Sequence, residues 1–356
     1  MKSSWLCART TRLATAAVWY RAFPCIAGLL LSACRPDSAP QNAPSAVVTS
    51  DSVLLAPPKQ SRIAALRTSA QVQQLLASVD STYNHKRFTV DTAMRLLDPR
   101  VAWRYRKAGV RAWERADLDG NCRPDLVVTG VFNSGAPYPQ TGAVVCLLDM
   151  GDSLVLDNLG RDYERYAPIA RVVYRQGQPL LQYQDFDPPI ITVDSLRDAQ
   201  SFLLTYRFGG FIEYNPRPGQ DGPLDSLSYK YDFAYDDYLT FKLVLKANRA
   251  ATYRACEGPV LKVEGPTICE DLTTRVTEAK MAEINTLLSY LDAAQLKPYY
   301  QASVNHVPHA TLTLAYRDGR CVRVSDAGEN GTFGLARLYT LLAELRKTQR
   351  WQRLKP

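Results

Sequence analysis

The sequence predicts an α+β protein built from short helices and antiparallel sheets. Apolar residues recur at helical spacing in a few segments, whereas many other stretches alternate polar and apolar residues and end in turn-forming residues. In the first half the helical segments precede the strands rather than alternating with them, which favours antiparallel sheets. The chain has 356 residues. Because that is long for one hydrophobic core, we expect two domains.

The first expected domain covers residues 61–215. A helix is predicted over 69–83, where Val72, Leu75 and Leu76 recur at helical spacing, and a second over 89–97, ahead of an Asp-Pro pair. Segments with the alternating pattern of strands follow, separated by turn-forming residues. Strands are expected at 125–132, 143–149, 153–159, 169–175, 179–184 and 190–193.

A linker is expected at 216–236, because prolines and glycines crowd its first half. The second expected domain covers 237–356. Its predicted helices, 277–291 and 333–346, each carry an apolar stripe, and Asp318-Gly319 is a strong hairpin signal. Strands in this domain are expected at 240–246, 250–255, 310–316 and 320–325.

The N-terminus has the layout of a secretory signal. Basic but no acidic residues precede Cys34, and an apolar run ends in Leu31-Ser32-Ala33-Cys34. This ending resembles the lipobox of bacterial lipoproteins. The resemblance implies that residues 1–33 are a cleaved signal peptide and that Cys34 becomes lipidated. A transmembrane anchor is the alternative, but Pro24 and Gly28 interrupt a run far shorter than the roughly 20 residues that span a bilayer.

Residues 34–60 are rich in Pro, Ala and Ser. Such a composition cannot bury enough apolar surface to fold, so we expect a disordered tether. Lipid on Cys34 then holds the protein at a membrane of the bacterial cell envelope, on the periplasmic side or at the cell surface. Loss of residues 1–33 lowers the formal net charge from +8 to +4, because four basic residues and no acidic ones leave. That balance does not favour a nucleic-acid partner.

Five of the eight cysteines lie beyond Cys34, in a compartment where disulfides persist. Cys256 and Cys269 flank a turn-rich segment and are placed to face each other across a hairpin. A disulfide between them is one expectation, and the alternative is that both are small buried apolar residues. Because the chain has no Cys-x-x-Cys pair, the sequence supports neither a redox motif nor a zinc ribbon.

The sharpest local motif runs from Asp117 to Asp125. Asp117, Asp119, Asn121 and Asp125 occupy positions 1, 3, 5 and 9 of a loop, and Arg123 offers its backbone carbonyl at position 7. Ca²⁺ takes about six to eight oxygen ligands, and alternate side chains of such a loop can converge to supply several of them. These five residues are therefore the candidate ligands of a structural Ca²⁺ ion.

The apolar pair Leu126-Val127 follows the last aspartate of this loop. In this respect the loop is similar to the calcium loops of FG-GAP-type repeats, in which such a pair enters a strand. It is not an EF-hand, because Val128 stands where the EF-hand has a glutamate. Cys122 also replaces the usual glycine at position 6, where a left-handed backbone is costly for other residues. The alternative is an Asx-rich turn without a metal.

Several short segments of the second half follow one another in a recognisable order. They are Leu239–Leu243, Thr252-Tyr253, Leu296–Tyr300, Thr311–Leu314 and the Asp318-Gly319 turn, with a last helix that ends near Trp351. Their order resembles a family of small bacterial domains of unknown function that is common in exported and lipid-anchored proteins. The resemblance covers roughly residues 237–351. It implies a fold and export but no activity.

No catalytic signature is recognisable, so we expect a non-catalytic role, either binding or structural, with an envelope protein or a glycan as partner. The alternative is a hydrolase of cell-envelope or polysaccharide substrates that uses paired carboxylates. The candidates for that role are Asp117, Asp119, Asp236 and Asp237. A stretch of tyrosines and aspartates over 229–238 is typical of a half-exposed strand, and the alternative is an aromatic platform for a sugar or peptide.

Overall fold

The computed structural model describes residues 61–92, 99–133, 141–159, 168–185, 200–219, 222–234, 237–259, 268–301, 307–329 and 331–354. Contacts divide the chain into two units, Met1–Pro58 and Lys59–Pro356, and all described residues belong to the second. The predicted signal peptide, Cys34 and the predicted tether lie outside the described residues. Among the helices that are described, none is both long and apolar enough to cross a membrane.

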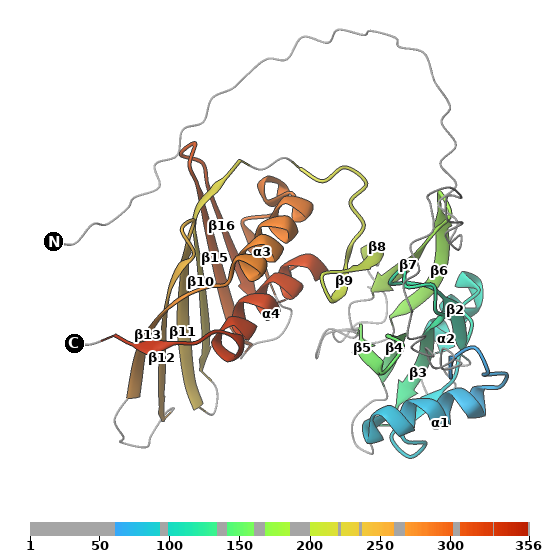
Figure 1. Cartoon of the computed structure of the whole chain (residues 1–356). Coiled ribbons are helices and arrows are strands. Elements are labelled where there is room, and N and C mark those ends of the chain that lie inside the picture. The colour runs from blue at the N-terminus through green and yellow to red at the C-terminus, as the bar shows by residue number, and fades with distance from the viewer. Residues whose placement is uncertain are drawn as a thin grey trace, which may run out of the picture. The chain divides into compact units, whose positions relative to one another are not determined.

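The first sheet packs against helix α1 (Figure 1). Its central strand is β3; β1 and β2 pair with successive parts of one edge, and β4 pairs with the other edge and then with β5. All of these pairs are antiparallel. The elements of this region are α1 (Ser69–Val79), β1 (Phe88–Val90), α2 (Pro99–Ala108), β2 (Trp113–Ala116), β3 (Asp125–Phe132), β4 (Thr141–Asp149) and β5 (Leu154–Asn158).

The next described strands form a second antiparallel sheet in sequence order. The strands are β6 (Ile169–Arg175), β7 (Gln178–Asp185), β8 (Gln200–Arg207) and β9 (Gly210–Glu213). Its last strand reaches the C-terminal helix: the carboxylate of Glu213 accepts hydrogen bonds from the backbone N–H groups of Phe333 (2.6 Å) and Gly334 (2.9 Å). This contact places an acidic side chain at the positive end of a helix dipole.

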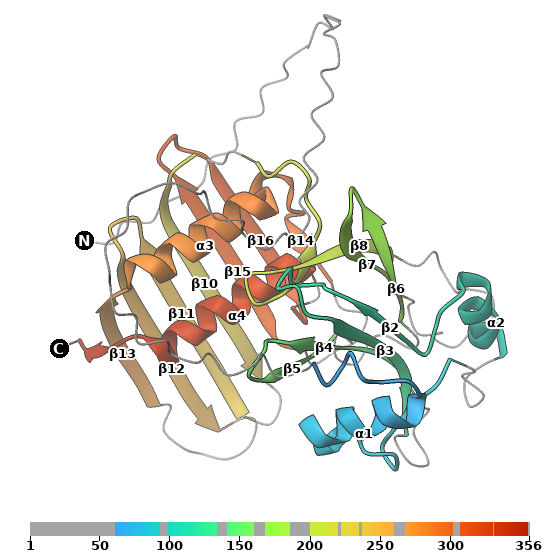
Figure 2. The same ribbon diagram turned by 45° about the vertical axis from the view of Figure 1, so that its right-hand side comes forward.

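The third described sheet has eight strands in the order β14-β16-β15-β10-β11-β12-β13-β17. Neighbouring strands of this sheet are antiparallel, except that β14 and β16 are parallel. Helices α3 and α4 lie across one face of this sheet (Figure 2). The strands are β10 (Leu224–Ala234), β11 (Asp237–Lys246), β12 (Ala250–Pro259), β13 (Ile268–Arg275), β14 (Tyr299–Tyr300), β15 (His309–Tyr316), β16 (Cys321–Ala327) and β17 (Gln352–Arg353), and the helices are α3 (Glu278–Leu291) and α4 (Phe333–Thr348).

Threonine side chains set where three of the helices begin. Thr68 and Gln71 form a capping box at the start of α1, and Thr277 and Thr332 accept hydrogen bonds from backbone N–H groups in the first turns of α3 and α4. These bonds satisfy donors that a helix start otherwise leaves without partners. The apolar stripes of α3 and α4 then pack on leucines and tyrosines of the eight-stranded sheet and form the largest described core.

The sequence prediction of α+β structure holds, since the described residues form mostly antiparallel sheets with a few helices. The linker predicted at 216–236 is wrong in its second half. Leu224–Ala234 is strand β10, which pairs with both β11 and β15 inside the eight-stranded sheet. Lys59–Pro356 forms one compact unit, and the division into two domains, 61–215 and 237–356, stays a prediction.

Two further differences concern single elements. The helix predicted over 89–97 is not found at its start, where Phe88–Val90 is strand β1, and a helix, α2, begins instead at Pro99. The sequence does not predict the strands β2, β8, β9, β13, β14 and β17. The strand predicted at 190–193 lies outside the described residues.

Candidate metal centre

The predicted calcium loop connects strands β2 and β3. Ala116 and Asp125 are paired across the two strands, so the loop closes on itself between them. Two residues of the loop have a left-handed backbone, Gly120 (φ 79°) and Cys122 (φ 65°). The second value confirms that position 6 of the motif needs the conformation that favours glycine, although a cysteine stands there.

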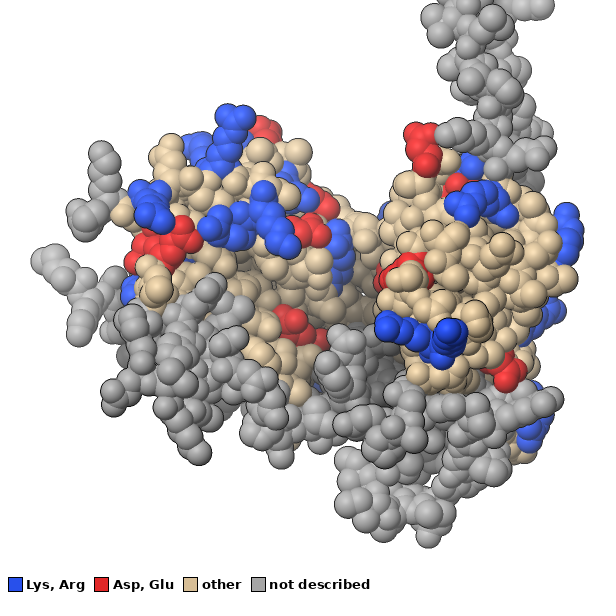
Figure 3. Space-filling view, turned by 90° about the horizontal axis from the view of Figure 1, so that it is seen from below, with Lys and Arg blue, Asp and Glu red and all other residues tan. Residues whose placement is uncertain are grey.

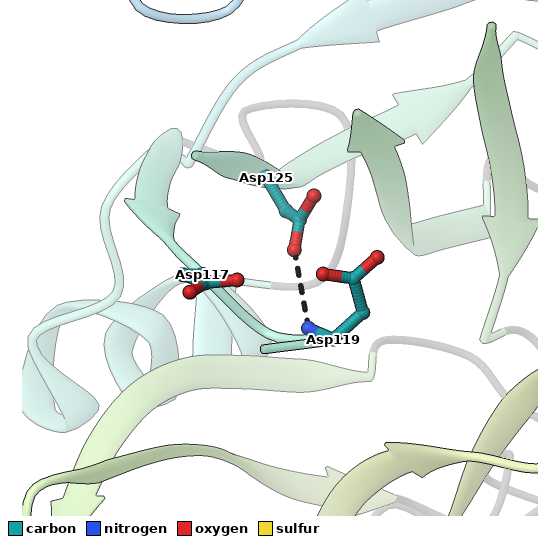
Figure 4. A group of neighbouring side chains, drawn as sticks. All are labelled: Asp117, Asp119 and Asp125. Carbon is teal, nitrogen blue, oxygen red and sulfur yellow. Dashed lines mark hydrogen bonds between the residues drawn. The ribbon is translucent and has the colours of Figure 1, made fainter. Parts of the chain in front are cut away.

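The loop brings three carboxylates together. Oxygen atoms of Asp117, Asp119 and Asp125 all lie within 4.8 Å of one another. Figure 4 shows the three side chains directed into the same space, with Asp125 at the start of its strand and Asp117 and Asp119 on the loop. This spacing suits a shared cation, because hard cations such as Ca²⁺ take several carboxylate oxygens at about 2.3–2.6 Å each.

Asp125 is fully buried and heavily hydrogen-bonded. Its side chain accepts backbone N–H donors from Leu118 (2.7 Å) and Asp119 (3.4 Å) at one oxygen and from Asp149 (2.8 Å) at the other. The residue is 0 % exposed, and burial raises the pKa of its carboxyl to about 6 despite these hydrogen bonds. Asp125 therefore fastens the loop to the end of strand β4.

Asp117 and Asp119 have unequal surroundings. Burial raises the pKa of Asp119, and the neighbouring Asp117 carboxylate raises it further. One oxygen of Asp117, Oδ2, accepts the N–H of Cys122 at 2.9 Å. The other, Oδ1, is buried, and no hydrogen-bond partner for it lies among the described residues. A buried carboxylate oxygen without a donor is costly unless a cation or a proton reaches it.

Asn121 and Arg123 tie the loop to strand β4. The Asn121 amide donates to Asp119 Oδ2 (2.9 Å) and to the carbonyl of Asp149 (2.8 Å), and its Oδ1 accepts the N–H of Arg123. An amide oxygen has a second lone pair, so Asn121 can still serve as a ligand. Whether the Arg123 carbonyl is a ligand stays a prediction.

Sequence reasoning missed Asp149, the last residue of β4. The Arg123 guanidinium donates two hydrogen bonds to the Asp149 carboxylate, from Nε to Oδ1 at 2.9 Å and from a second nitrogen to Oδ2 at 3.2 Å. Burial, the largest single effect, opposes ionisation of Asp149, but hydrogen bonds from Arg123, Ser61 and the Gly151 N–H, together with the Arg123 charge, outweigh it and lower the pKa. No local signal identifies this residue, because its role depends on the pairing of β3 with β4.

The other candidate residues lie elsewhere in the chain. Asp237 begins strand β11, in a different sheet from the strands that flank the loop of Asp117 and Asp119, and Asp236 lies outside the described residues. A disulfide joins Cys256 and Cys269, which are directly opposite on β12 and β13.

The aromatic stretch is partly internal. Tyr229 is 1 % exposed, stacks on Tyr339 of α4 and donates a hydrogen bond to Glu329 (2.8 Å), while Tyr231 stacks on Phe241. These two tyrosines therefore contribute to the core region rather than to an exposed platform.

Comparison with known proteins adds no identification. No known family model matches the chain, and no curated protein matches it. The three carboxylates, an amide oxygen and loop carbonyls form a donor set made of oxygen, which suits Ca²⁺ rather than softer metals.

Proposed function

We propose that this chain is a lipid-anchored exported protein that acts by binding rather than by catalysis, and that its 117–125 loop holds a structural Ca²⁺ ion. The observation that supports the metal ion is the buried Oδ1 atom of Asp117. It has no hydrogen-bond partner among the described residues, and two further carboxylates lie close to this side chain. The lipid anchor rests on the sequence Leu31-Ser32-Ala33-Cys34.

The surroundings of the carboxylates favour a structural ion over acid/base chemistry. A raised pKa often marks a catalytic carboxyl, but Asp125 is 0 % exposed and its oxygens receive three backbone hydrogen bonds. A substrate has no access to such a group. A cation that neutralises the cluster instead fixes the β2–β3 loop against the end of β4, through Asp125 and the Arg123–Asp149 ion pair.

Thermal unfolding with and without calcium tests the metal. For an extracellular-type Kd of about 10⁻⁴–10⁻³ M, about 10 mM CaCl₂ stabilises the folded state by about 1.4–2.7 kcal/mol relative to excess chelator. For a unit of about 300 residues this raises Tm by about 2–4 °C. Asp119→Asn keeps the acceptor for the Asn121 N–H but removes a charge, so we expect it to abolish most of the shift.

Asp225→Asn is the matched control, because Asp225 is an exposed carboxylate on β10 outside the loop. It should keep the full calcium shift. Equal Tm values in calcium and in chelator for the unmodified protein contradict the structural ion.

Expression in a bacterial host with a labelled fatty acid tests the anchor. We expect the chain to incorporate the label and to sediment with membranes, and Cys34→Ser to lose both properties. Cys25→Ser, a change within the expected signal peptide, is the control. Label that persists in the Cys34 variant contradicts the proposed anchor.

A further inference from the structure

The eight-stranded sheet has a face opposite to α3 and α4, and we call it the open face. Residues on a strand alternate between the two faces, so the neighbours of the core residues Leu227, Tyr229 and Leu243 belong to the open face. No described helix packs on this face. The charged residues at its centre include Lys230 and Asp232 on β10, Lys242 and Lys246 on β11, Arg254 on β12 and Asp271 on β13.

Three basic side chains lie in one row across the strands of this face. Lys230 is directly opposite Lys242, and Lys242 is directly opposite Arg254, on the neighbouring strands β10, β11 and β12. We call Lys230, Lys242 and Arg254 the cationic row. Adjacent strands are about 4.8 Å apart, and like charges placed directly opposite each other destabilise a sheet. Lys242 has a cation directly opposite on both sides, an arrangement that attracts anions.

The acidic residues on the open face do not balance its cations. Asp232 pairs with Lys230 (2.6 Å) and Asp271 with Arg254 (3.8 Å). Lys242, Lys246 and Arg323 are exposed and have no ion pair within the described part of the chain. Figure 3 shows basic and acidic side chains on the side of the molecule that is seen from below.

The uncharged residues of the open face indicate which class of anionic partner it suits. Threonine and serine hydroxyls on β15, β10 and β12 surround the cationic row and can donate to anionic oxygens. The described aromatic rings of these strands, such as Tyr229, Phe241 and Tyr253, pack toward α4 on the other face. A single-stranded nucleic acid is usually bound with aromatic rings for base stacking, and an amphipathic helix at a membrane surface inserts apolar side chains.

We propose that the open face binds a linear anionic glycan, whose carboxylate groups lie along the cationic row. The charges are complementary, and a polymer that crosses the strands meets Lys230, Lys242 and Arg254 in turn. This inference deepens the proposed binding role by naming a surface and a class of partner. It does not depend on the calcium loop, which belongs to another sheet.

The test measures binding of the full-length protein to polygalacturonate, a carboxylated glycan, with neutral dextran and anionic phosphatidylglycerol vesicles as comparisons. We expect binding to polygalacturonate that weakens as salt rises, because exposed charges are screened. The triple variant Lys230→Gln, Lys242→Gln, Arg254→Gln should bind about tenfold more weakly, as expected for the loss of three exposed ion pairs.

A matched triple variant removes the same charge elsewhere. Arg217→Gln, Lys297→Gln, Lys347→Gln changes three exposed cations outside the open face and should bind like the unmodified protein. The single variant Lys242→Gln, at the centre of the row, serves if the triple variant fails to fold. It should weaken binding while Tm stays at or above that of the unmodified protein.

Two results overturn the inference: no binding to polygalacturonate, whether or not the vesicles are bound, or equal loss of binding in the two triple variants. The measurements are repeated in chelator and with the Cys34→Ser protein. Glycan binding that survives both conditions supports the open face even if the metal and the anchor fail their own tests. If the unmodified protein shows the calcium shift in Tm but does not bind the glycan, the proposal for the open face is wrong and the proposal for the metal stands.

Discussion

Replacing Lys242 by threonine should stabilise the protein, although it removes a side chain from the middle of a sheet. Lys242 has a cation directly opposite on both sides, Lys230 and Arg254. Each cross-strand pair of like charges costs about 0.2–1 kcal/mol. Because the side chains of Lys230 and Arg254 are 50 % and 63 % exposed, solvent screening keeps the sum near the lower end, at about 0.5–1 kcal/mol.

Lys246→Thr isolates this electrostatic cost from the general preference of strands for threonine. Lys246 lies on the same strand and the same face, but its directly opposite neighbour on β10 is Ser226, which is uncharged. The comparison of the two variants therefore removes the effect of strand propensity. For a unit of about 300 residues, we expect Lys242→Thr to raise Tm by about 1–2 °C more than Lys246→Thr does.

Urea unfolding at low salt and at high salt completes the assay. The Debye length falls from about 8 Å at physiological ionic strength to about 3 Å at 1 M salt, so the difference between the two variants should nearly vanish at high salt. Equal stabilities at low salt, or a difference that salt leaves unchanged, refute the argument that like charges strain this sheet.

Three other changes give distinct expectations. Glu213→Ala should destabilise the fold by about 2–4 kcal/mol in urea unfolding, because it leaves two helix-start N–H groups without their charged acceptor; Glu213→Gln should lose less, and equal losses contradict the role of the charge. Burial raises the pKa of Glu329 despite a hydrogen bond from Tyr229, so the native state binds the proton more tightly than the unfolded state and stability declines as pH rises above about 4.3. Glu329→Gln should match the unmodified protein at acidic pH and exceed it at neutral pH, and parallel pH profiles refute this. The Cys256–Cys269 disulfide closes a loop with a sequence separation of 13, so Cys256→Ser with Cys269→Ser should lower the unfolding free energy by about 3 kcal/mol in non-reducing buffer, and an unchanged value contradicts a stabilising bridge.

Much of the candidate metal centre follows from local sequence. The side chains of Asp119 and Asn121 accept N–H donors two residues further along, and Asp117 accepts the N–H of Cys122, so the loop forms its turns from nearby residues. The partners from β4 could not be predicted in this way. Asp149 is distant in sequence, and it reaches Asp125 and Arg123 because β3 pairs with β4.

The sequence by itself determined the α+β composition, the helices α1, α3 and α4 and the hairpin at Gly319, because short-range periodicity, caps and turn residues decide these features. The tertiary structure alone decided that residues 224–234 form an internal strand, although prolines and glycines precede them. It also decided that Glu213 caps α4 and that Lys230, Lys242 and Arg254 form a row. The physical reason is shared: strand pairing fixes a register between residues far apart in the chain, and no local pattern states which residues will face each other.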